Sequence, residues 1–253
     1  MINRIPLLKQ STVRVFVNGS PCGSGFAVAD DLVATCFHVV QEVSATPTGQ
    51  TRITYATSIE VELPTGQRVA AQVHPCCQNN GFGNAVSRDF VVLQVHRATL
   101  RPLPMGSLSS AAEGEPVYMA GFPFGIDQAV VATGIISTKW LASGYLNEGS
   151  TREAAWIDIT MNSGNSGGPV LRLGTSEVDD EVIGIAAFGL NPFAAVAKGL
   201  AQVAAAFPGS VHLLDVDFKH FATLIGDALK SNSLGVGGLI TIDYARAAAC
   251  GRW

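Results

Sequence analysis

Residues 161–170 read MNSGNSGGPV, a loop in which two serines stand among three glycines and two asparagines. Side chains this small add little to a hydrophobic core. Glycine instead lets the backbone approach a neighbouring group closely and adopt a positive φ. A serine hydroxyl is a poor nucleophile unless a positioned base takes its proton. The loop therefore indicates a catalytic site only if the chain also supplies a histidine and a carboxylate.

Short runs rich in β-branched and aromatic residues lie on both sides of this loop, separated by Gly, Pro, Asn and Asp. Up to residue 122 they read TVRVFV, GFAVA, LVATCF, RITYA, IEVEL, RVAAQVH, FVVLQVH and PVYMAGF, and beyond it AVVATGIIST, AAWIDIT, PVLRL and EVIGIAAF. Many short strands at this spacing predict an all-β barrel or sandwich. We expect two β units in tandem, divided near residues 105–115, with no close sequence repeat between them.

The sequence changes character after residue 190. Asn191 and Pro192 are the residue types of a helix N-cap and first helical position, and a second helix is expected from Asp217. Residues 190–233 therefore predict a helical insertion, after which GVGGLITI at 235–242 returns to strand and IDYARAAAC suggests a short terminal helix. The apolar faces expected on the two helices are Phe193, Ala197, Leu200 and Ala204, and Phe218, Phe221, Ile225 and Leu229.

The composition is that of a folded, mildly acidic protein. Hydrophobic residues make up 47% of the 253 and charged residues only 14%, which argues against disorder. The net charge is −4 and the Lys and Arg residues are scattered, so we expect no nucleic-acid partner. The N-terminal apolar run is too short for a signal peptide, and the apolar stretch 182–206 is interrupted by Asn191, Pro192, Lys198 and Gln202. We therefore expect a cytoplasmic protein without a membrane helix.

The five cysteines, at positions 22, 36, 76, 77 and 250, form an odd set without the spacing of a disulfide scaffold. Because no export signal is visible, we expect free thiols. The adjacent Cys76 and Cys77 would suit a metal or redox role, but a lone pair of this kind is weak evidence for either.

One histidine and one aspartate stand out by position. His38 follows the buried run DDLVATCF, itself preceded by GSGF at 23–26, and Asp89 stands at the mouth of the apolar strand FVVLQV. Taken alone, Asp89 is typical of a strand-start cap. The other histidines lack such a pattern and are interpreted as ordinary core or surface residues: His74, His96, His212 and His220.

Together the three segments, in the order His38, Asp89 and Ser166, resemble the trypsin/chymotrypsin-like serine proteases, most closely the bacterial HtrA/Deg protease domain. GSGF, HVV, LPTGQRVAAQV, GEPVYMAGFPFG, TGIIS and GNSGGPV…VIGI follow the order of that domain across residues 12–190, and the resemblance returns at 235–242. It implies two tandem six-stranded β-barrels with the active site between them. Residues 1–110 would carry His38 and Asp89, and residues 111–253 would carry Ser166 and the insertion 190–233.

The resemblance also implies the role of each residue. Ser166 would attack a carbonyl carbon, His38 would act as base and then as acid, and Asp89 would orient the imidazole. The backbone N–H groups of Gly164 and Ser166 would form the oxyanion hole. This chemistry needs no metal and no organic cofactor.

Two positions depart from trypsin. Asn165 replaces the aspartate that pairs with a new N-terminus, so activation by N-terminal cleavage is not expected. Ala187 replaces a serine that supports the catalytic aspartate in trypsin, and it has no hydroxyl to donate.

Substrate contacts follow from the same resemblance. Thr160 stands where trypsin carries its specificity carboxylate, and we expect it to contact substrate together with Met161 and Asn162. Phe188 and Gly189 match the strand that pairs with extended substrates. Because no acidic side chain occupies residues 160–163, we expect a small or medium apolar residue before the cut.

Three functions remain open. The first is a serine endopeptidase acting on proteins or peptides, the second a catalytically idle peptide-binding or scaffold module of the same fold, and the third an acyl esterase. We expect no PDZ domain. The insertion 190–233 is either a packed structural excursion or a lid or platform for a regulatory partner.

Overall fold

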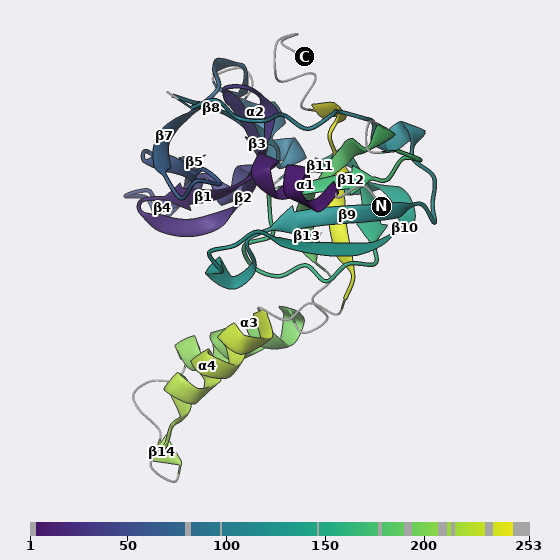
Figure 1. The fold of residues 1–253 in the computed structure, drawn as a ribbon. Coiled ribbons are helices and arrows are strands. Elements are labelled where there is room, and N and C mark those ends of the chain that lie inside the picture. Colours follow the sequence, from purple (N-terminus) through teal and green to yellow (C-terminus); the bar gives the residue numbers. More distant parts are fainter. Residues whose placement is uncertain are drawn as a thin grey trace.

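The computed structural model describes residues 4–78, 82–96, 98–145, 147–176, 179–189, 194–206, 212–213, 216–230 and 235–244. Within these ranges the chain forms two closed six-stranded antiparallel barrels, and a helical hairpin extends away from them (Figure 1). The two tandem barrels expected from the sequence are therefore confirmed.

The first barrel has the strand order β1-β2-β3-β8-β7-β6. Its strands are β1 (Thr12–Val17), β2 (Ser20–Ala29), β3 (Leu32–Thr35), β6 (Ile59–Glu62), β7 (Arg68–Val73) and β8 (Val91–Val95). Exposed and buried residues alternate along RVAAQV of β7, as expected for a strand with one face toward the barrel interior. A separate two-stranded sheet, β4 (Gln41–Ala45) with β5 (Thr51–Tyr55), follows the turn that carries His38.

The second barrel has the order β10-β11-β16-β13-β12-β9. Its strands are β9 (Pro116–Gly121), β10 (Val130–Gly144), β11 (Asn147–Ile157), β12 (Pro169–Arg172), β13 (Glu181–Gly189) and β16 (Gly237–Thr241). The long strand β10 pairs first with β9 and then, from Ile136, with β11. The β10–β11 hairpin therefore continues beyond the β9 edge, and Tyr145 at its turn donates a backbone hydrogen bond to Ser87 of the first half of the chain.

Short helices join the strands. They are α1 (Arg4–Ser11), α2 (Phe82–Arg88) and the 3-10 turns η1 (Phe37–Val39), η2 (Pro75–Cys77), η4 (Leu108–Ser110) and η5 (Pro123–Gly125). The sequence did not predict α1 or α2, because segments of seven or eight residues carry too few apolar repeats to show a helical period. None of the helices in the described part of the chain is long and apolar enough to cross a membrane.

The insertion contains α3 (Ala194–Ala206) and α4 (Phe218–Lys230), joined through the short strands β14 (His212–Leu213) and β15 (Val216–Asp217). The expected helix start at Asn191 lies outside the described residues. The expected terminal helix, 242–250, also lies outside them, apart from its first three residues, 242–244. Asp217 caps α4 as predicted, since its Oδ1 accepts the backbone N–H of Lys219 at 2.8 Å.

The predicted apolar face of α4 is exposed at the two positions for which burial is known. Phe221 and Ile225 are 50% and 38% exposed, whereas Ala222 is buried. The two helices pack through small residues: Ala197 and Ala204 of α3 are buried, and a Cβ added to Gly226 of α4 would lie 3.6 Å from the carbonyl of Ala197. Small residues let the backbones approach closely, so the larger side chains of α4 point away from α3.

The expectation that every thiol is free is also wrong. Cys22, Cys36 and Cys77 are free, but Cys76 is disulfide-bonded. A disulfide forms where two Cβ atoms come within about 4 Å, a condition set by the tertiary fold and not by spacing in the sequence.

Candidate active site

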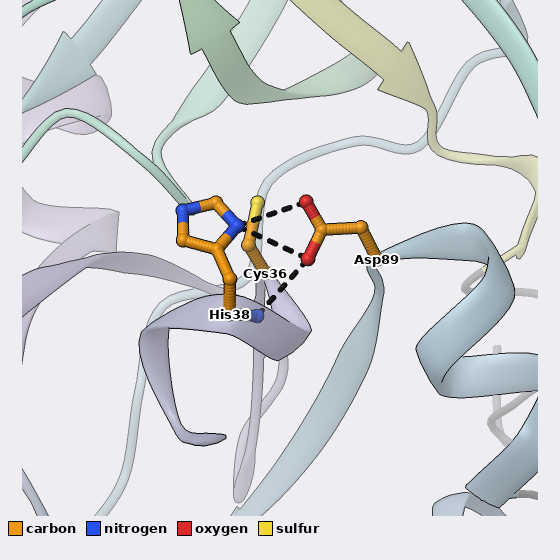
Figure 2. Close-up of side chains that lie close together, drawn as sticks. All are labelled: Cys36, His38 and Asp89. Atoms are coloured by element: carbon orange, nitrogen blue, oxygen red, sulfur yellow. Dashed lines mark hydrogen bonds and ion pairs between the residues drawn. The ribbon is translucent and has the colours of Figure 1, made fainter. Parts of the chain in front are cut away.

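His38 and Asp89 meet at the end of the first barrel (Figure 2). His38 lies in η1, directly after β3, and Asp89 lies between α2 and β8 with a φ of 55° that an aspartate tolerates. Nδ1 of His38 is 2.9 Å from Oδ2 and 3.0 Å from Oδ1 of Asp89, and the His38 backbone N–H donates to Oδ1 at 3.0 Å. Because the ionised carboxylate only accepts, Nδ1 carries the proton and Nε2 is left as the base.

Burial differs sharply within this pair. The Asp89 side chain is 2% exposed and that of His38 is 25% exposed. The carboxylate is thus shielded from water, whereas the outer edge of the imidazole can reach a substrate.

Cys36 lies beside the pair, and its Sγ, an imidazole nitrogen and a carboxylate oxygen all lie within 4.8 Å of one another (Figure 2). Burial, followed by the charge of Asp89, raises the pKa of the Cys36 thiol well above 9.0. The neutral thiol donates to the carbonyl of Ala186 at 3.3 Å. Since a metal requires the thiolate, this donor set suits a hydrogen-bonded pair with a packed thiol better than a metal centre.

Ser166 lies in the turn before β12, and Ser24 of β2 fixes that turn from the first barrel. The Ser24 backbone N–H donates to the Ser166 carbonyl at 2.7 Å, and its hydroxyl donates to the Gly164 carbonyl at 2.6 Å. The same hydroxyl accepts the Phe122 backbone N–H at 3.0 Å. Sequence analysis assigned no role to Ser24, although it lies inside the GSGF motif.

The turn also lies against the strand end that leads to His38. The Gly167 N–H donates to Ala186 at 2.7 Å, the carbonyl that also accepts from the Cys36 thiol. Gly167 has a φ of 89°, and a Cβ there would lie 1.9 Å from the Ser24 carbonyl oxygen and 2.2 Å from Oγ1 of Thr35. No other residue fits this approach.

The hydroxyl of Ser166 makes no hydrogen bond to His38 or to any other residue among those described. In unliganded active sites the bond between nucleophile and base is often loose and tightens when substrate binds. The Ala186 carbonyl, which accepts from both Gly167 and Cys36, thus links the turn of Ser166 to the segment of His38, without a completed triad bond.

The backbone N–H groups of the loop fall into two classes. Those of Asn165, Gly167 and Gly168 donate to Asn162, Ala186 and Asn165 at 3.0, 2.7 and 3.0 Å. Those of Gly164 and Ser166 have no acceptor among the described residues. Both N–H groups that the resemblance assigns to an oxyanion hole are therefore free to donate to another group.

Phe188 and Gly189, which are expected to contact substrate, lie at the end of β13. The edge of β13 opposite β16 has no strand partner after Ile185, which leaves residues 187–189 open to an extended peptide among the described strands. Phe188 lies against Gly238, where a Cβ would be 1.9 Å from the ring.

Met161 is buried and lies against Gly237, where a Cβ would be 2.3 Å from its Cγ. Thr160 is exposed and lies 3.6 Å from the Cβ position of Gly235, and Asn162 accepts a backbone hydrogen bond within the turn. Thr160 and Met161 therefore lie next to the segment that leads into β16, and of the three residues only Met161 contributes a buried apolar surface.

A pocket of about 330 Å³ adjoins the loop on the side of β2. Its lining includes Cys22, Gly23, Phe122, Phe124, Ser163 and Gly164. A larger cavity of about 660 Å³ lies against β5, β6 and β7 and contains none of the predicted site residues.

Arg152 of β11 is a second residue that sequence analysis missed. Its Nη1 lies 3.4 Å from Oδ2 of Asp89, and its side chain is 10% exposed. The residue is one of three charged residues in the β11 sequence, and no local pattern marked it.

Comparison with known proteins identifies the group to which this arrangement belongs. Residues 23–185 match the family described as trypsin-like peptidase domain. The chain belongs to the trypsin-like peptidases. The match spans the segments of His38, Asp89 and Ser166 and ends within β13.

The curated relatives of this peptidase are HtrA-type enzymes. Serine protease HTRA4 of Homo sapiens is 33% identical over 166 residues, which are 64% of this chain and 29% of that protein. A probable periplasmic serine endoprotease DegP-like of Halomonas elongata is 31% identical over 168 residues, 64% of this chain and 28% of the relative. The chain thus spans less than a third of the length of these relatives.

Solved structures agree in fold. HtrA-type protease AlgW with tripeptide has a TM-score of 0.62 at 19% identity, covering 98% of this chain and 61% of that chain. The Rv3671c protease in an inactive form has a TM-score of 0.61 at 17% identity, covering 98% and 91%. The chymotrypsin-like architecture inferred from the sequence is therefore confirmed.

Proposed function

We propose that this peptidase is a serine endopeptidase that hydrolyses peptide bonds through His38, Asp89 and Ser166. The observation that carries the proposal is the pair of unpaired N–H groups of Gly164 and Ser166, which alternate along the turn with the hydrogen-bonded N–H groups of Asn165 and Gly167. Two free donors at one turn are a ready site for a developing oxyanion. The HtrA-type relatives support the same chemistry.

The reaction begins with the His38–Asp89 pair. Asp89 accepts from Nδ1–H, so the lone pair of Nε2 takes the Ser166 proton while Oγ attacks the carbonyl carbon of the substrate. The carbonyl oxygen becomes negative and accepts from the N–H groups of Gly164 and Ser166. The imidazolium then protonates the leaving amine, the C–N bond breaks, and an acyl-enzyme remains. Water repeats the sequence with His38 as base and releases the acid and Ser166.

Substrate preference follows from the surroundings of the turn. Phe188 and the buried Met161 supply apolar surface, and no carboxylate stands among residues 160–163. The guanidinium of Arg152 lies 5.3 Å from the centre of the Phe188 ring, which adds positive charge near this surface. No carboxylate in this segment is placed to pair with a lysine or arginine before the cut, so a small or medium apolar residue fits better.

The decisive experiment is labelling with a fluorophosphonate probe, with the two loop serines compared. Ser166→Ala abolishes labelling and lowers kcat by about 10⁴-fold to 10⁶-fold, because only the nucleophile is lost. Ser163→Ala is the matched control: it removes an exposed hydroxyl from the same loop and leaves labelling intact. Labelling that survives in Ser166→Ala, or disappears in Ser163→Ala, contradicts the mechanism.

The same material separates the alternatives. An idle peptide-binding module does not label at all, and the missing Ser166–His38 hydrogen bond is the observation that favours it. An acyl esterase labels, but turns over simple esters and not peptides. Turnover of peptides with an apolar residue before the cut, lost in Ser166→Ala, supports the endopeptidase.

A further inference from the structure

Arg152 is a buried cation at the catalytic aspartate. Its Nη1 lies 3.4 Å from Oδ2 of Asp89, the same oxygen that lies 2.9 Å from Nδ1 of His38. The Arg152 side chain is 10% exposed and that of Asp89 is 2% exposed. Removing a guanidinium from water is costly unless an anion faces it, so the two charges depend on each other.

The contact acts through charge more than through hydrogen bonding. The Nε and Nη1 atoms of Arg152 form no hydrogen bond, and 3.4 Å is an ion-pair distance. The guanidinium also lies over the ring of Phe188, which limits its freedom to move away. Arg152 is therefore held as a fixed positive charge beside the carboxylate.

Asp89 lacks a partner that trypsin provides. Its oxygens accept from the backbone N–H and from Nδ1 of His38. The resemblance places a serine hydroxyl at position 187, and this chain has Ala187 there. The guanidinium on β11 faces the same carboxylate from another strand.

We infer that Arg152 is a positioning residue for the reaction: its charge holds the Asp89 carboxylate in place of the missing hydroxyl and opposes protonation of His38. This inference rests on the proposed function. Without the cation, the imidazolium is favoured, and His38 is a neutral base only at higher pH.

The other groups around His38 do not carry charge that could replace Arg152. The Cys36 thiol, between β3 and η1, stays neutral because burial raises its pKa. Tyr145, between β10 and β11, lies 5.9 Å from the imidazole between ring centres, and burial raises the pKa of its phenol. Among the described residues around His38, Asp89 and Arg152 are thus the charged groups that set its environment.

The test compares Arg152→Met with Arg152→Lys, and uses Arg172→Met as the matched control. Arg172 also pairs with a carboxylate of the second barrel, Glu181 at 2.9 Å, and is 21% exposed. The rate of fluorophosphonate labelling is measured against pH, and the pH at which the Cε1 proton signal of His38 changes is followed by NMR.

Arg152→Met is expected to move the midpoint of both profiles upward by about half a unit to one unit. A rise of one unit cuts the neutral fraction at the wild-type midpoint from one half to about one eleventh, so labelling there slows about fivefold, while at about pH 9 the rates converge. Arg152→Lys is expected to have the wild-type midpoint because it keeps the charge. This variant provides the test if Arg152→Met does not fold. Arg172→Met leaves the midpoint unchanged.

Two results overturn the inference: a folded Arg152→Met with both midpoints unchanged, or an Arg152→Lys whose midpoint moves upward by about half a unit or more although the charge is kept. Failure of the proposed function is a different result, since the wild type then does not label at any pH. In that case the NMR midpoint still decides whether Arg152 opposes the protonation of His38.

Discussion

Gly164→Ala tests the oxyanion hole with one added methyl group. Gly164 has a φ of 97°, and a Cβ there would lie 2.2 Å from the carbonyl oxygen of Phe122. Real Cβ atoms are essentially never closer than 3.0 Å to such an atom, so the loop or the end of β9 must shift by at least about 0.8 Å. Left-handed backbone also costs a non-glycine residue about 1–2 kcal/mol.

A shift of this size is enough to misdirect the Gly164 N–H. Loss of one oxyanion donor costs about 10²-fold to 10³-fold in kcat, or roughly 2.7–4 kcal/mol of transition-state stabilisation. Because the donor acts on the developing charge and not on the substrate ground state, kcat and kcat/KM are expected to fall together while KM stays near the wild-type value.

Gly49→Ala provides the control. Gly49 has a φ of 80° in the turn between β4 and β5, and nothing lies within 4 Å of its Cβ position. It therefore carries the backbone cost without the clash. The assay is peptide hydrolysis for kcat and KM, with urea unfolding of each variant. If Gly164→Ala keeps more than about a third of the wild-type kcat and loses no more stability than Gly49→Ala, the oxyanion assignment is wrong.

Two further predictions concern the thiols and the insertion. Burial raises the pKa of the Cys36 and Cys77 thiols above 9.0, so above this pH the folded state keeps protons that the unfolded chain loses. The contribution of the two thiols to the free energy of unfolding is therefore fully present below about pH 9 and falls as the pH rises beyond it. Urea unfolding against pH checks this: Cys36→Ala flattens the decline, the exposed Cys22→Ala leaves it intact, and equal slopes in all three proteins refute it. Leu200→Asp, on α3, is expected to loosen the helical hairpin and to increase its cleavage in limited proteolysis. The thermal unfolding midpoint of the barrels is expected to stay unchanged, because the hairpin extends away from them (Figure 1). Unfolding of the whole protein would show that the hairpin belongs to the core.

The architecture could be predicted because its determinants are local. Alternating burial along β7 and the short apolar runs between turn residues are visible in the chain itself. The glycines of the loop are also a local signal, because they predict a backbone conformation at their own positions. Gly164 and Gly167 adopt φ values of 97° and 89°, which other residues rarely tolerate. A helix of seven residues such as α2 shows no comparable pattern, and it was missed.

The packing of the insertion could not be predicted for a related reason. Apolar periodicity marks a face, but it cannot say which element covers that face. In α4 the contact with α3 runs through Ala222 and Gly226, and the larger Phe221 and Ile225 are exposed. Close backbone approach decided the packing, and that preference appears only when both helices are placed.

By itself, the sequence determined the order and chemical types of His38, Asp89 and Ser166, and the loop that offers backbone donors. Only the tertiary structure showed that Ser24 fixes this loop from the other barrel, that Cys76 is disulfide-bonded, and that Arg152 faces Asp89. The backbone conformation of a residue and the apolar pattern around it depend mainly on the residue itself and on its neighbours in the chain. Its electrostatic partner depends on where distant strands cross. The β10–β11 hairpin brings Arg152 to Asp89, 63 residues away in the chain, because the closed second barrel holds that hairpin against the segment before Asp89.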